Sequence, residues 1–141
     1  MRAYRCAAVV IALASATALA QGKACSPADS KAAEQALDRV VNWDLLHKAW
    51  KDYNHCESGA AKDAFTEAFL RLAVQWKDVE QFAARYQAEP QYKAFIQRHI
   101  ASPAAKDDAE SLFSRAKSDC PPRLEAFCAE IAEAAKAAQG K

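Results

Sequence analysis

Alanine is the residue that most restricts how this chain can fold. After position 20 it accounts for 27 of the remaining 121 residues, while glycine occurs there only at Gly22, Gly59 and Gly140. Alanine is the best helix former because it loses no side-chain entropy on entering a helix. Strands need β-branched residues and turns need glycine, and both are scarce here. The composition therefore predicts an all-α fold, formed as a single domain over 21–141.

Signals for helix ends divide this domain into six or seven short helices. Ser26-Pro27, Asn42, Ser58-Gly59, Glu89-Pro90 and Ser102-Pro103 all suit helix starts or breaks. The expected helices span about 28–40, 43–54, 59–76, 78–89, 90–101, 104–117 and 122–138. We expect a compact bundle, with fraying in the alanine-rich and charged tail after residue 132.

Charges in the sixth expected helix follow the helix dipole. Asp107, Asp108 and Glu110 lie in its first turns, and Arg115 and Lys117 lie in its last turn. Acidic groups are favoured at the N-terminus of a helix and basic groups at its C-terminus. The dipole is thus sufficient to explain this charge pattern.

Aromatic residues recur at helical spacing and form stripes. Trp43, Trp50, Phe65, Phe69 and Phe82 are the clearest members. Such stripes normally pack helix on helix as a core. The alternative is a pocket for a lipid or another apolar ligand, for which the many small alanines would leave room.

The first 20 residues have the pattern of a cleavable secretory signal. Arg2 and Arg5 precede an apolar run of about 14 residues, which is shorter than a membrane span, and Ala18-Leu19-Ala20 suits signal peptidase. Cleavage after Ala20 would lower the Lys and Arg count from 19 to 17 against 18 acidic residues, a net charge of −1. We therefore expect a periplasmic or secreted protein with no nucleic-acid partner, because nucleic-acid binding usually needs a clustered basic excess.

Four cysteines remain after Cys6 leaves with the signal: Cys25, Cys56, Cys120 and Cys128. An even number in an exported chain predicts two disulfides. With a helix starting at Pro121-Pro122, Cys120 and Cys128 would lie about 12 Å apart, too far for a bridge. The expected pairings are Cys25–Cys128 with Cys56–Cys120, or Cys25–Cys120 with Cys56–Cys128.

The sequence contains no clear catalytic, metal or cofactor motif. His47, His55 and Glu57 lie near Cys56, but they lack the tight ligand pairs of a structural zinc site. No serine in the domain occupies a glycine-flanked nucleophile turn. We expect His99 to lie at the edge of the core and to bond a backbone carbonyl. We expect neither an enzyme nor a bound cofactor.

The turn around Cys56 is the most specific local feature. A disulfide at a helix junction would make this corner rigid, and Asp52, His55 and Glu57 would surround it. Such an acidic corner is suited to contact a partner protein. A purely structural, capped corner is the alternative.

Several segments resemble a group of small exported proteins of proteobacteria. They are 43–50 (WDLLHKAW), 56–60 (CESGA), 65–72 with Trp76, 95–100 (FIQRHI), Cys120-Pro121 and Cys128. The resemblance implies export and a helical architecture, and it implies no active site. In architecture alone, the chain is also similar to helical, disulfide-bearing periplasmic immunity proteins, which block peptidoglycan-cleaving effectors.

These observations favour a periplasmic protein-binding module, such as an inhibitor or immunity protein. The alternatives are a carrier of a small apolar ligand and a structural or envelope protein without a discrete site. The expected partner is another periplasmic protein.

Overall fold

Seven α-helices and two short 3₁₀ helices make up the part of the chain that the computed structural model describes, residues 22–140. They are α1 (Pro27–Leu37), α2 (Trp43–Tyr53), η1 (Asn54–Cys56), α3 (Gly59–Ala73), α4 (Val79–Ala88), α5 (Pro90–Ile100), η2 (Pro103–Ala105), α6 (Lys106–Ser118) and α7 (Glu125–Gln139). No strand occurs in this range, and the all-α fold is confirmed. The expected signal segment, with Cys6, lies outside the described residues.

Local sequence explains where most helices start. The Ser26 and Asn42 side chains accept hydrogen bonds from the backbone N–H groups of Asp29 and Leu45, which caps α1 and α2. Pro27 and Pro90 occupy the first positions of α1 and α5. Gly59 opens α3 with a φ of +53°, a conformation that glycine adopts without strain.

Three helix ends differ from the expectation. α1 ends at Leu37 and α3 at Ala73, so each is about one turn shorter than expected. α7 begins at Glu125, and it continues to Gln139 instead of fraying. Burial explains this last difference, because Ala132, Ala135 and Ala138 are all covered.

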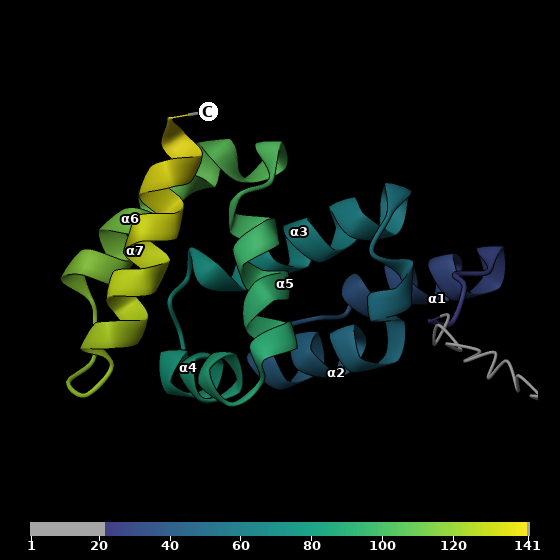
Figure 1. Ribbon diagram of the computed structural model, residues 1–141, viewed down its shortest axis with the longest axis horizontal. Coiled ribbons are helices and arrows are strands. Elements are labelled where there is room, and N and C mark those ends of the chain that lie inside the picture. The colour runs from purple at the N-terminus through teal and green to yellow at the C-terminus, as the bar shows by residue number, and fades with distance from the viewer. Residues whose placement is uncertain (1–21, 141) are drawn as a thin grey trace, which may run out of the picture.

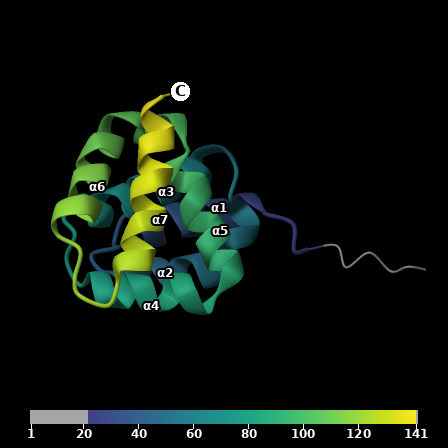
Figure 2. The ribbon, with the colours of Figure 1, turned by 60° about the vertical axis from the view of Figure 1, so that its left-hand side comes forward.

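The helices form two groups with α5 between them. α6 and α7 pack along each other as a hairpin on one side, and α1 packs on α2 and α3 on the other (Figure 1). α4 runs across one end of the molecule and contacts α5 and α2. Turned by 60°, the molecule shows α6 and α7 side by side in front of α3 (Figure 2). No helix within 22–140 is long and apolar enough to cross a bilayer.

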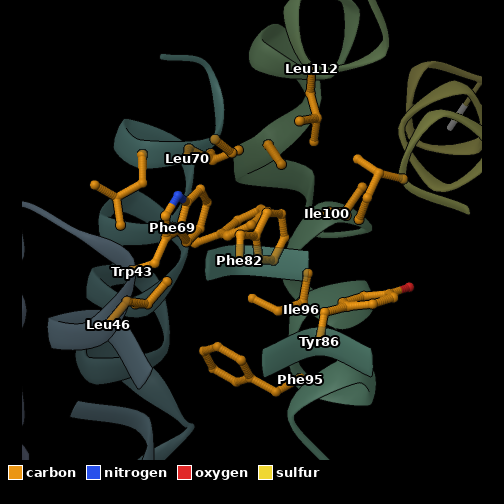
Figure 3. Close-up of a cluster of buried hydrophobic side chains, with 14 of the residues drawn as sticks. Trp43, Leu46, Phe69, Leu70, Phe82, Tyr86, Phe95, Ile96, Ile100 and Leu112 are labelled. Carbon is orange, nitrogen blue, oxygen red and sulfur yellow. The ribbon is translucent and has the colours of Figure 1, made fainter. Parts of the chain in front are cut away.

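Aromatic side chains fill the centre of the core. Phe82 is fully buried and stacks on Trp43, with ring centroids 4.1 Å apart. The Phe82 ring also packs edge-on against Phe69, Tyr86 and Phe127. In Figure 3 it lies in the middle of the labelled side chains from α2 to α6. The aromatic stripes therefore form a packed core that joins distant helices.

The disulfides are Cys25–Cys56 and Cys120–Cys128, so both expected pairings are wrong. The error comes from the start of α7. Residues 121–124 form a turn before the helix, with Arg123 in a left-handed conformation at φ 76°. This turn brings the Cα atoms of Cys120 and Cys128 to 6.0 Å, within disulfide range. Cys25 and Cys56 then join the N-terminal segment to η1.

The junction between α3 and α4 has an unusual backbone. Trp76 and Asp78 have φ angles of 54° and 48°, which non-glycine residues seldom adopt. The Trp76 indole N–H donates to the Asp119 carbonyl at 3.0 Å, and the Trp43 indole N–H donates to the Lys77 carbonyl at 2.8 Å. Contacts from distant segments therefore hold this junction.

Candidate functional site

The three residues of the expected acidic corner do not share one surface. Asp52 is exposed and pairs with Lys48, one helical turn away, at 2.6 Å. His55 is half-buried and lies 3.4 Å from Asp29 of α1. Glu57 turns instead towards α5 and is only 14% exposed. Each residue has its own intramolecular partner, which gives this corner a structural role.

Glu57 belongs to a polar cluster with buried Thr66 of α3 and with exposed Arg98 and buried His99 of α5. Arg98 donates two hydrogen bonds to the Glu57 carboxylate, at 2.9 and 2.6 Å. His99 has no exposed surface, and its Nδ1 lies 2.7 Å from Thr66 Oγ1. Its Nε2 lies 3.5 Å from Glu57 Oε1 and has no hydrogen-bond partner. The expected bond from His99 to a backbone carbonyl is absent from the described structure.

The contact between Thr66 and His99 allows two arrangements of protons. The Thr66 hydroxyl has one proton, which it gives either to the Lys62 carbonyl at 3.1 Å or to His99 Nδ1. If Nδ1 accepts, the neutral ring carries its proton on Nε2 and directs this N–H towards Glu57. If Nδ1 donates, the neutral ring presents a lone pair on Nε2 to the carboxylate, which is the less favourable arrangement.

The environment of Glu57 favours its ionised form. Burial raises the pKa of this carboxyl, but the interactions with His99 and Arg98 outweigh burial and lower the pKa from 4.5 to about 2. A depressed folded-state pKa stabilises the fold above the unfolded pKa. This contribution is lost as the pH falls from about 4.5 through about 2.

We expect Glu57→Gln to destabilise the fold at neutral pH and to lose that effect in acid. The substitution would keep the size of the side chain but remove the charge that faces Arg98 and His99. The difference in unfolding free energy between wild type and variant should therefore shrink as the pH falls from about 5 to 2. Urea titrations over this range measure it, with Glu133→Gln on the exposed face of α7 as the control. A difference for Glu57→Gln that stays constant with pH would contradict the assignment.

The hydroxyl, imidazole and carboxylate of this cluster lie in the order of a catalytic triad. A nucleophile must also reach its substrate. Thr66 is 1% exposed, and the Lys62 carbonyl competes for its proton. The geometry therefore suits the joining of α3, α5 and η1 better than nucleophilic attack.

The remaining histidine is engaged elsewhere. His47 lies 2.7 Å from Glu89, which also pairs with Lys51, and the His47 ring packs edge-on against Tyr92. His47 is thus not grouped with His55 and Glu57. Among residues 22–140, no group of three or more His, Cys, Asp or Glu side chains is arranged to hold a metal ion.

A groove of about 460 Å³ runs along one side of α3. Ala104 of η2 and Asp108 of α6 form its other wall. The contribution of α3 is a stripe with helical spacing: Asp63, Thr66, Glu67, Leu70, Arg71 and Val74. Thr66 and Leu70 are buried, whereas Asp63 and Glu67 are exposed, so the bottom is largely apolar and the edge is acidic.

A second hollow continues along α6. It also has a volume of about 460 Å³ and shares Val74 with the first. Its α6 wall consists of Asp107, Glu110, Ser111, Ser114 and Arg115. We call the two hollows together the α3–α6 groove.

Charges in the α3–α6 groove are unbalanced. Within the described chain, Asp63, Glu67 and Asp108 form no ion pair or side-chain hydrogen bond. The two arginines are engaged. Arg71 donates to the carbonyls of Leu37 and Val40, at and beyond the end of α1, and Arg115 pairs with Asp119 at 2.7 Å. Arg71 keeps its positive charge because carbonyls do not neutralise it, but the five acidic residues that line the groove outnumber its two arginines, so the groove is negative overall.

Comparison of the chain with protein-family models, curated proteins and solved structures yields no match. The function must therefore be argued from the molecule itself, and the α3–α6 groove is the candidate site.

Sequence reasoning missed this site. The spacing of Asp63, Glu67, Leu70 and Val74 was visible as a second stripe on the third helix. That stripe could not be distinguished from an ordinary solvated helix face, because the partners of its charges depend on tertiary contacts.

Proposed function

We propose that the protein is a binding module that receives a positively charged segment of another protein in the α3–α6 groove. The observation that carries this proposal is the unmatched charge of the groove. Elsewhere in the fold, acids such as Glu57, Glu89 and Glu130 have basic partners. Asp63, Glu67 and Asp108 instead surround a hollow with a partly apolar bottom. Complementary charge is a common means of selecting a partner.

The two disulfides support a site of action outside the cytoplasm, because such bridges persist in oxidising compartments. In that setting, a binding module that catalyses no reaction would act by binding its partner and blocking the partner's activity. An inhibitor or immunity protein is the form of this proposal that best fits a small and covalently stabilised bundle.

Carriage of a small apolar ligand is less well supported. Aromatic rings occupy the centre of the bundle, and the two hollows of the groove are open and edged by charge. Carriers instead enclose most of their ligand in an apolar pocket.

Capture from an envelope extract of the source organism tests the proposal. We expect the immobilised, disulfide-bonded protein to retain a specific partner and to lose it when Asp63→Lys and Glu67→Lys are combined. Raising NaCl to about 0.5 M should also weaken the capture, because salt screens exposed charges. The partner should be identified by mass spectrometry.

The matched control combines Glu80→Lys and Glu133→Lys. Both residues are helical acids outside the groove, so this variant has the same change in net charge. A partner that both double variants retain equally, or that both lose, would contradict binding through the groove.

A further inference from the structure

We infer that the segment received by the α3–α6 groove is an amphipathic helix with basic residues on both sides of an apolar stripe. This inference rests on the proposed function and specifies the chemistry of the partner. It follows from the shape of the two walls, the nature of the bottom and the placement of the charges.

The first wall is regular. Its α3 residues follow one another at positions 63, 66, 67, 70, 71 and 74, so they form one stripe of a straight helix. From Asp63 to Val74 this stripe is about 16 Å long, which corresponds to about three helical turns. A second helix of three turns would match it in length.

The second wall is also a helical stripe. Asp107, Glu110, Ser111 and Ser114 recur at i, i+3, i+4 and i+7 along α6. α6 packs against α7, and α3 meets η2 at the start of α6. The two hollows therefore meet where α3 ends and α6 begins, and a partner helix would pack along the α3 stripe with the start of α6 at its side.

The bottom of the groove distinguishes a helix from an extended segment. Leu70 is 7% exposed and Val74 is half-buried, and they lie one turn apart with Ala104 opposite. Apolar anchors at i and i+4 of a docked helix would cover both. An extended segment that binds by adding a strand needs the free edge of a sheet. Residues 22–140 contain no strand that could offer such an edge.

The charges indicate where the basic residues of the partner lie. Asp63 and Glu67 are one turn apart on the α3 wall of the first hollow, and Asp108 lies on its other wall. Lysines or arginines would therefore flank the apolar stripe of the docked helix on both sides. The pairing of Arg71 with backbone carbonyls leaves these acids available.

A pair of synthetic peptides tests the inference directly. The first has about 18 residues, a leucine stripe at helical spacing and flanking lysines, a length at which a helix is stable enough to form on docking. The second has the same composition in an order that forms no stripe. We expect the first to bind the disulfide-bonded full chain with a dissociation constant below about 100 μM. Circular dichroism should show that this peptide gains helix on binding.

Variants assign the binding to the groove. Asp63→Lys with Glu67→Lys should weaken binding of the first peptide about tenfold or more, while Glu80→Lys with Glu133→Lys should leave it unchanged. Replacing the leucines of the peptide by serine should also weaken binding if the apolar bottom is used.

The possible outcomes separate the two proposals. If both peptides bind equally, or if neither binds, the helical partner is overturned. The capture experiment with the envelope extract then still decides whether the groove binds a protein. If that capture also fails to depend on Asp63 and Glu67, the proposed function fails as well.

Discussion

Replacement of Phe82 by alanine is expected to remove about 3–5 kcal/mol of stability, the usual cost of deleting a buried phenylalanine. Phe82 is fully buried, and its ring meets those of Trp43, Phe69, Tyr86 and Phe127. These partners come from α2, α3, α4 and α7. They cannot all move together to fill the cavity that the substitution would leave. Because a typical domain is stable by only about 5–15 kcal/mol, this loss would remove a large share of the free energy of unfolding.

Urea unfolding followed by circular dichroism measures this loss. Phe113→Ala is the matched control, since Phe113 is half-buried and packs at the edge of the core. We expect it to cost much less than Phe82→Ala. An equal loss for the two variants would mean that Phe82 does not form the centre of the core.

The second large effect concerns the disulfides. Replacement of Cys25 and Cys56 by alanine should cost more stability than replacement of Cys120 and Cys128. The bridges span 31 and 8 residues, and the entropy of the unfolded chain then predicts losses of about 3.7 and 2.5 kcal/mol. Each bridge joins one buried and one half-buried cysteine, which makes the two double variants comparable in packing.

Thermal melts of the two double variants should show this order, with decreases on the order of 10 °C for the longer loop. Peptide mapping without reduction checks the pairing itself. A fragment that joins Cys25 to Cys120 or Cys128 would contradict the present connectivity. The reverse order of stabilities would indicate that chain entropy does not dominate here.

The helices could be predicted closely because their signals are local. Alanine content, the caps at Ser26 and Asn42, and the prolines at the first positions of α1 and α5 act within one turn of the chain. The aromatic stripes likewise identified the core, since residues at helical spacing share one face.

The disulfide pairing could not be predicted, because it depended on the start of one helix. Pro121-Pro122 suggested the first turn of α7, whereas the chain makes a turn there and Arg123 adopts a left-handed conformation. Because α7 starts about one turn later than expected, the Cys120–Cys128 disulfide, which had seemed too long to form, becomes possible.

The candidate site was missed for a different reason. Asp107 and Asp108 were adequately explained by the helix dipole, and Glu57 stood out because of its neighbouring cysteine. Whether an acid is matched depends on residues far away in sequence, such as Arg98 for Glu57. The acidic corner predicted from the sequence has its own partners within the molecule. The groove acids that have no ion pair lie instead on α3 and α6.

The junction between α3 and α4 has a consequence for shortened forms of the chain. The left-handed backbone at Trp76 costs about 1–2 kcal/mol, and a hydrogen bond to a residue 43 positions later helps to hold it. α3 and α4 can each form from local signals, but the angle between them also depends on contacts from α2, where Trp43 bonds Lys77, and from the segment around Asp119. We therefore expect a chain that stops before the C-terminal hairpin to keep its first five helices but to lose one of the contacts that fix the angle between α3 and α4.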